Sequence, residues 1–152
     1  MLGIVSSTSA LKFAKVGGSR QLPVLGKLSS DSLKIPDEAE EGLILAKFYD
    51  WLKDFCATNE VDCISLLKAV GGQQGGPAEI RVKIEGLIQL LGATLAIPVR
   101  LMVPNSLRNE EKRFDIYTGA TPEVRFADGK KFKSKELKDA TLVAWAALAA
   151  AT

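Results

Sequence analysis

Short runs of apolar residues, separated by polar or glycine-containing turns, occupy the first fifth of the chain. Residues 2–5 are followed by serine and threonine, residues 10–16 alternate roughly and end at a glycine pair, and residues 22–28 form a third run. Alternation bounded by turn residues is typical of strands. Pro23 favours an edge position for the third run, because proline cannot donate to a ladder. This segment predicts an antiparallel meander of three strands.

From Asp37 onward the apolar residues recur at steps of three and four, which is the period of a helix. Asp37 follows a proline and is suited to cap a helix whose first turn is acidic, as the helix dipole favours. The apolar face of this helix consists of Leu45, Phe48, Leu52, Phe55 and Cys56. The aliphatic residues 61–67 then predict a buried strand.

A second helix and strand follow in the same order. Residues 71–76 are glycine and glutamine and predict a loop, and Pro77 opens a helix at the position where its missing N–H costs nothing. The apolar face of that helix consists of Ile80, Ile84, Leu87, Ile88 and Leu91. Gly92 is suited to its C-cap. Residues 97–103 predict another strand, which ends at Pro104.

The rest of the chain predicts a short helix from Asn105, a loop over residues 117–129 and an alanine-rich closing helix over residues 135–150. A meander followed by alternating helices and strands predicts an α/β fold with a mixed sheet, because helical crossovers make the strands that they join parallel. We expect five strands with the first in the centre, flanked by helices. The length of 152 residues fits a single domain over residues 1–152.

Composition limits the chemistry of the chain. It contains no histidine and two cysteines, which excludes the usual zinc sites and histidine-dependent triads. Cys56 and Cys63 lie among apolar residues, which favours free thiols over a disulfide. The N-terminus lacks the pattern of a signal peptide, and the last apolar run is shorter than the roughly 20 residues that span a bilayer. We expect a soluble, cytoplasmic protein with no membrane partner.

The net charge of +2 is too small to indicate a partner, so the distribution of charge has to be considered. The dense basic segment consists of Lys130, Lys131, Lys133, Lys135 and Lys138, with Arg125, Phe126 and Phe132 nearby in sequence. Such a segment can contact phosphates without reading base sequence. Acidic neighbours dilute it, and a solvated loop and helix start is the alternative interpretation.

Several segments together resemble the ribonuclease H-like superfamily, and within it the RuvC-type Holliday-junction resolvases. Residues 2–7 (LGIVSS) are similar to their opening strand. Residues 61–68 (VDCISLLK), the glycine-rich loop and a helix that ends with residues 90–92 (LLG) resemble their central unit. Residues 97–99 (IPV) and 103–105 (VPN) are similar to their fifth strand and the turn after it. A small uncharacterised bacterial group of resolvase-like proteins resembles the chain more closely, over residues 61–92.

The resemblance implies a nuclease chemistry that uses four acids around two metal ions, which stabilise the attacking and leaving oxygens. Carboxylates suit magnesium, which prefers oxygen ligands. Glu136 and Asp139 keep the spacing of the two acids on the last helix, although ordinary surface charges near a helix start are the favoured explanation. The first-strand acid falls at Val5, and the fourth-strand acid falls at Leu67 or Leu66. The resemblance thus implies a degenerate site with no complete set of metal ligands.

The resemblance also draws attention to the glycine-rich loop, a region that approaches DNA in the resolvases. Lys68, Gln73 and Gln74 are therefore candidate nucleic-acid contacts. Exposed backbone N–H groups before a helix can hold an anion. The loop nevertheless lacks the lysine and hydroxyl ending of a P-loop, so a plain connection is the alternative.

Three functions stay open at this point. The first is a degenerate resolvase-like domain that binds nucleic acid or a protein partner without cleavage and needs no cofactor. The second is an active magnesium- or manganese-dependent endonuclease with displaced acids, namely Glu79, Glu85, Glu136 and Asp139. The third is a pure interaction or assembly protein. Candidate partners are branched or duplex DNA, bound weakly, another protein, or a second copy in a homodimer.

Overall fold

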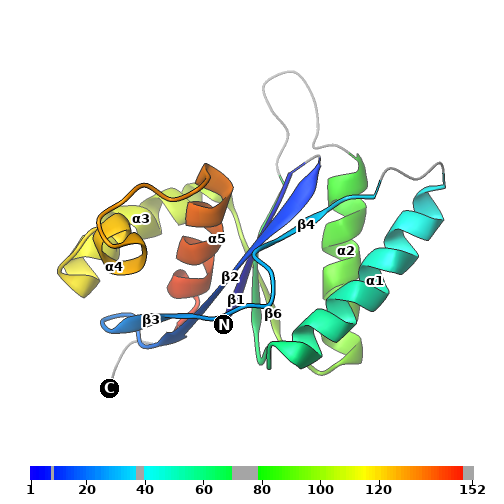
Figure 1. Cartoon of the computed structure of the whole chain (residues 1–152), viewed down its shortest axis with the longest axis horizontal. Coiled ribbons are helices and arrows are strands. Elements are labelled where there is room, and N and C mark those ends of the chain that lie inside the picture. Colours follow the sequence, from blue (N-terminus) through cyan, green and yellow to red (C-terminus); the bar gives the residue numbers. More distant parts are fainter. Residues whose placement is uncertain (8, 37–39, 70–78, 149–152) are drawn as a thin grey trace.

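Six strands form one mixed sheet in the part of the chain that this computed structural model describes, residues 1–7, 9–36, 40–69 and 79–148 (Figure 1). The strands are β1 (Leu2–Ser6), β2 (Ala10–Gly18), β3 (Pro23–Gly26), β4 (Ser32–Lys34), β5 (Ile64–Leu67) and β6 (Val99–Met102). The helices are α1 (Glu41–Thr58), α2 (Glu79–Thr94), α3 (Pro104–Thr118), α4 (Pro122–Ala127) and α5 (Lys135–Ala146).

The sheet order is β3-β2-β1-β5-β6, so the first strand is central, as the sequence predicted. β1 pairs antiparallel with β2 and parallel with β5, which in turn pairs parallel with β6. The mixed α/β architecture is therefore confirmed. The expected count of five strands was one too few, because β4 pairs with the first residues of β2. At three residues, β4 is too short to give a periodic signal.

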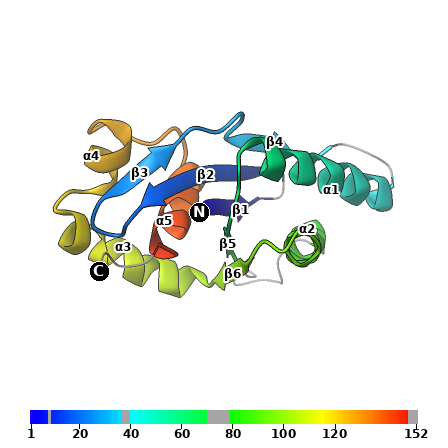
Figure 2. The same ribbon diagram turned by 90° about the horizontal axis from the view of Figure 1, so that it is seen from below.

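Helices cover both faces of the sheet (Figures 1 and 2). α1 and α2 pack on one face, where Leu2 and Ile4 of β1 join the main apolar core. α5 packs on the other face, with α3 beside it. Val5 lies on this second face, in contact with Ala140 of α5. Alternation along β1 therefore assigns one set of side chains to each helical layer.

Two glycines allow close packing between layers. A Cβ on Gly3 of β1 would lie 1.9 Å from the carbonyl oxygen of Ala140, so α5 rests almost directly on the strand backbone. A Cβ on Gly92 would lie 2.3 Å from Cγ2 of Val99 in β6. The expectation that Gly92 is a C-cap was wrong, since α2 continues to Thr94.

The first two helices have the predicted apolar faces, but their ends differ from the prediction. α1 begins at Glu41, and its N-cap residue Glu40 makes no side-chain capping bond. Asp37 lies outside the described residues, as do residues 71–76 and Pro77.

The region after β6 is more helical than expected. α3 runs for 15 residues from Pro104, and Gly119 ends it in the left-handed conformation, with φ of 70°. The predicted loop over residues 117–129 contains α4, whose N-cap Thr121 accepts a hydrogen bond from the N–H of Val124. α5 begins after Ser134, which caps it in the same way, and ends at Ala146.

Both cysteines are free thiols, as the sequence favoured. Burial raises the pKa of Cys56 to about 11, so its thiol stays protonated at neutral pH. Among the described residues, no helix combines the length and the apolar character that crossing a membrane requires.

Candidate functional site

An apolar cluster occupies the place on β1 and β5 where the resemblance puts two metal-binding acids. Val5 and Leu67 are direct neighbours in the register of the two parallel strands. Val5 is 5% exposed and packs with Ala14 of β2 and Ala140 of α5, and the half-buried Leu67 packs against the same group. These side chains carry no oxygen ligand, so they extend the core between the sheet and α5.

The two remaining family positions lie in the first half of α5. Glu136 is half-buried in the first turn, where the helix dipole favours a negative charge. Asp139 is 9% exposed, and its carboxylate forms an ion pair with Lys135 one turn earlier. With aliphatic residues at the two strand positions and a lysine on Asp139, the side chains present here do not fit two magnesium ions.

The displaced acids of the alternative nuclease do not come together. Glu79 and Glu85 belong to α2, whereas Glu136 and Asp139 belong to α5 on the opposite face of the sheet (Figure 1). Glu79 pairs with Lys83, which lowers the pKa of this glutamate. Glu85 is buried and accepts a hydrogen bond from the backbone N–H of Ala69. Within the described ranges, no three acidic or cysteine side chains form a group that could hold a metal ion.

The basic segment divides into paired and less constrained lysines. Lys138 lies 2.9 Å from Glu111 and 2.8 Å from Glu123, and these hydrogen bonds raise the pKa of Lys138 while lowering that of Glu123. Lys135 is held by Asp139. Lys138 therefore links α5 to α3 and α4, whereas Lys135 pairs within α5. The charge of both lysines is largely neutralised.

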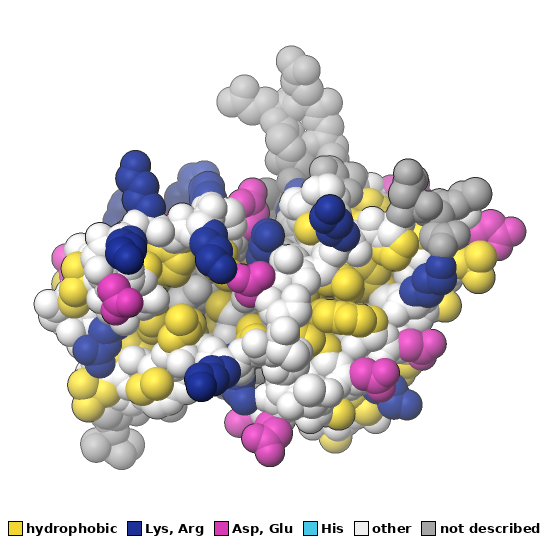
Figure 3. Space-filling model, viewed as in Figure 1, with side chains coloured by type: hydrophobic (Ala, Val, Ile, Leu, Met, Phe, Trp, Pro, Cys, Tyr) yellow, Lys and Arg dark blue, Asp and Glu magenta, His cyan; other side chains and the backbone are white. Residues whose placement is uncertain are grey.

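The loop between α4 and α5 carries the accessible positive charge. Lys130 and Lys131 are exposed, and neither has a carboxylate within 4.0 Å among the residues that the structure describes. Lys133 is 86% exposed and lies 3.9 Å from Asp31, a contact between solvated groups that contributes little. Figure 3 shows lysine and arginine side chains around an apolar hollow on this side of the molecule.

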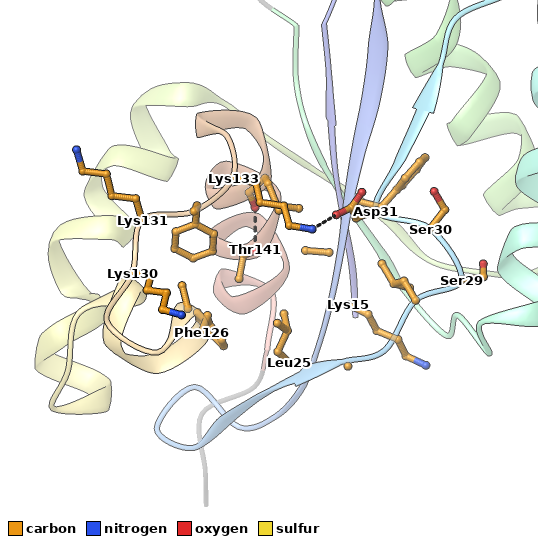
Figure 4. Close-up of a pocket in the computed structure, with 17 residues that line it drawn as sticks. Lys15, Leu25, Ser29, Ser30, Asp31, Phe126, Lys130, Lys131, Lys133 and Thr141 are labelled. Atoms are coloured by element: carbon orange, nitrogen blue, oxygen red, sulfur yellow. Dashed lines mark hydrogen bonds and ion pairs between the residues drawn. The ribbon is translucent and has the colours of Figure 1, made fainter.

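Lysines 130, 131 and 133 also lie on the rim of a pocket of about 640 Å³ (Figure 4). These lysines and the neighbouring Phe126 and Phe132 form a recognisable segment in the sequence, but the opposite wall of the pocket does not. That wall comes from β2, β3 and the segment before β4, including Leu25, Ser30 and Asp31. No local pattern connects these residues, since the fold brings them together across about a hundred positions.

The other candidate contacts are only partly described. Lys68 is exposed just beyond the carboxyl end of β5, and its backbone N–H donates to the carbonyl of Met102. Gln73 and Gln74 lie outside the described residues. Sequence analysis gave no signal for Arg81, whose Nε donates to Ser6 Oγ at 3.3 Å near the end of β1.

The sheet order and the two helical layers are those of the ribonuclease H-like fold, as the sequence resemblance led us to expect. RuvC of Thermus thermophilus superposes with a TM-score of 0.71 at 12% identity, covering 95% of this chain and 90% of RuvC. The same protein in complex with a Holliday junction substrate gives 0.72 at 12% identity, covering 95% and 88%. No family model and no curated protein sequence matches the chain. The likeness to RuvC is one of fold, and the function has to be argued from this chain's own residues.

Proposed function

We propose that this chain binds DNA without cleaving it, through a resolvase-like fold whose two-metal site has degenerated. The observation that carries the proposal is the apolar cluster of Val5, Ala14, Ala140 and Leu67. Two-metal cleavage of a phosphodiester needs oxygen ligands on both sides of the metal pair. Methyl groups at the two strand positions cannot supply them, and Asp139 is engaged by Lys135.

The support for DNA as the ligand comes from positive charge on the face of the sheet that also carries the apolar cluster. Lys130, Lys131 and Lys133 follow one another on an exposed loop directly before α5. Three phosphate contacts release about three counterions, which gives weak binding that declines with salt. Because RuvC, a neighbour in fold, was solved with a Holliday junction substrate, we propose branched or duplex DNA as the ligand class.

The test measures binding and cleavage on the same four-way junction and a matched duplex. Fluorescence anisotropy over a series of salt concentrations is expected to give micromolar affinity or weaker, with a negative dependence on log salt. Changing Lys130, Lys131 and Lys133 to alanine is expected to reduce the salt slope by roughly 2.7, at 0.9 per phosphate. Lys53→Ala is the matched control, because this exposed lysine lies on α1, across the sheet from the loop.

Cleavage is expected to be absent with magnesium or manganese. Metal-dependent cutting of the junction that Asp139→Asn abolishes would refute the proposal and support the nuclease with displaced acids. Absence of DNA binding even at low salt would instead favour the interaction protein.

One observation favours that second candidate, an interaction or assembly role. The edge strand β3 and the residue before it expose Leu22 at 67% and Val24 at 63%. An edge with unpaired backbone groups and apolar side chains is suited to contact another chain, including a second copy. Sedimentation of the wild type and of Val24→Lys tests this role: a dimer that the lysine disrupts would support it, and a monomer at high concentration would not.

A further inference from the structure

The pocket of about 640 Å³ lies between the sheet and the loop that joins α4 to α5. Its floor includes Ala14 of β2 and Thr141 of α5. Ala14 also belongs to the apolar cluster around Val5. The pocket therefore adjoins the position at which the resemblance places the catalytic centre, on its β2 side.

Aromatic and aliphatic side chains form the pocket walls. Phe126 and Phe132 are half-buried on one side, and Leu25 and Leu28 lie on the other. Phe126 is held from behind by Phe114, with ring centroids 5.5 Å apart. A fixed aromatic wall facing an open space of this size can receive a flat ring.

The polar groups lie at the rim. In Figure 4 the side chain of Lys133 reaches across the opening toward Asp31, whereas Lys131 points outward into solvent. Ser30 lies on the Asp31 side of the opening and donates through Oγ to the carbonyl of Ser32. The rim thus offers several cations, one carboxylate and a hydroxyl group around an apolar interior.

We propose that this pocket binds one nucleotide unit, with its base against the phenylalanine wall and its phosphate on the rim lysines. The proposal rests on the proposed function and names the group that the DNA presents to this face. Every base has a flat face, and stacking on aromatic side chains beside a cationic groove is a common mode of recognising single strands. The lysines supply the charge complement of the phosphate.

The single acid on the rim distinguishes a nucleotide from a simple anionic amphiphile. A simple fatty or aromatic acid carries no hydrogen-bond donor for Asp31 once Lys133 has turned to the carboxylate of the ligand. A base carries an amino group or a ring N–H that can donate a hydrogen bond to the carboxylate of Asp31, while its phosphate pairs with Lys133. The exposed pair of Lys133 and Asp31 costs little to separate, because its groups are already solvated.

The experiment uses 2-aminopurine, a fluorescent base that is quenched when it stacks. Three ligands are compared: 2-aminopurine deoxyribonucleoside monophosphate, a duplex in which the probe is an unpaired bulge, and the same duplex with the probe paired. We expect the bulged duplex to bind about tenfold tighter than the paired one, with quenching of the probe only when it is unpaired.

Two pocket variants leave the lysines in place. Phe132→Ala removes part of the wall, and Ala127→Leu narrows the pocket from the end of α4. Both are expected to abolish the preference for the bulge while duplex binding and its salt dependence persist. Ile116→Ala is the matched control, because this side chain is 79% exposed on α3 and lies outside the pocket lining.

The outcomes separate the two proposals. Equal affinity for paired and bulged duplexes, with salt-dependent binding intact, would overturn the nucleotide pocket and leave the proposed function standing. Binding and quenching of the free nucleotide without any duplex binding would support the pocket and overturn the proposed function. An acidic peptide that displaces the bulged duplex more strongly than the free nucleotide does would overturn the pocket in favour of a protein ligand.

Discussion

The apolar cluster makes a quantitative prediction for Val5→Asp, the change that would place an acid at the position on β1 where the resemblance puts one. Val5 is 5% exposed on the central strand, beside Leu67 and beneath Ala140. An aspartate here replaces two methyl groups by a carboxyl group in a space lined by aliphatic side chains. The apolar cluster of Ala14, Ala140 and Leu67 offers no hydrogen-bonding side chain, so the new group is desolvated without a partner in it.

Two contributions determine the size of the effect. Loss of the buried valine side chain costs about 1.5–3 kcal/mol. Burial of an unpartnered polar group costs about 1–3 kcal/mol more in protein mutational data. We therefore expect Val5→Asp to lower the free energy of unfolding by roughly 3–5 kcal/mol, which for a chain of this length corresponds to a fall in Tm of roughly 10 °C.

Urea unfolding at several pH values provides the assay, with Val5→Asn as the uncharged control. Burial raises the folded-state pKa of the new aspartate above its unfolded value of about 3.9. The folded state then binds more protons between these two pKa values, so the stability of the variant should fall as pH rises through that window. Val5→Asn should show the cost of polarity without the added pH dependence.

Magnesium is expected to recover part of the lost stability when a second acid is added at Leu67. In the double variant Val5→Asp with Leu67→Glu, two carboxylates face the α5 side near Asp139. Magnesium at 10 mM, with a Kd of about 1 mM, would then stabilise the fold by about 1.4 kcal/mol.

For Val5→Asp alone, a loss of unfolding free energy below about 1 kcal/mol, with the pH profile of the wild type, would refute the assignment of this position as core.

Two further changes test the packing of α5. Gly3→Ala is expected to cost about 3 kcal/mol or to prevent folding, because its Cβ would meet the carbonyl oxygen of Ala140, and thermal unfolding measures this directly. Lys138→Met is expected to cost about 1 kcal/mol at pH 7, because it removes contacts to Glu111 and Glu123. Since Lys138 lowers the pKa of Glu123, this stability is present above the unfolded pKa of that glutamate and lost as pH falls, so wild type and variant should converge in acid.

The long elements were predictable because their signals are periodic. The apolar positions of α1 and α2, spaced by three and four, became buried faces. The apolar run of residues 2–5 became the buried strand β1, and the rough alternation over residues 10–16 became β2. β4 and α4 were not predictable in this way. They have three and six residues, and β4 exists because β2 offers it a partner.

Gly92 illustrates a second reason for error. A glycine near the end of an apolar helical run favours a C-cap when the sequence alone is considered. In the structure the same glycine is required by the approach of Val99 from β6. Local sequence cannot distinguish a turn from a close tertiary contact, because both select the residue without a Cβ.

The basic residues of the candidate site were predictable from the sequence, but the ion pairs that some of them form were not. The sequence identified the basic segment, but only the structure separates Lys135 and Lys138, which are paired with acids, from Lys130 and Lys131. The partners of Lys138 come from other helices, and Asp31, near Lys133, comes from the far side of the pocket. Ion pairs between distant segments leave no trace in local charge patterns.

The aliphatic residues Val5 and Leu67 are compatible with a stable fold for an electrostatic reason. Carboxylates held close together on β1, β5 and α5 repel one another when no cation lies between them, and their burial is costly. Val5 and Leu67 carry no charge and add apolar contact beneath Ala140 at the centre of the sheet. The lysines of the α4–α5 loop are independent of this cluster, since they lie outside it on an exposed rim. Aliphatic side chains at these positions thus favour a stable core, and the exposed lysines of the loop stay available to a ligand, as the proposed function requires.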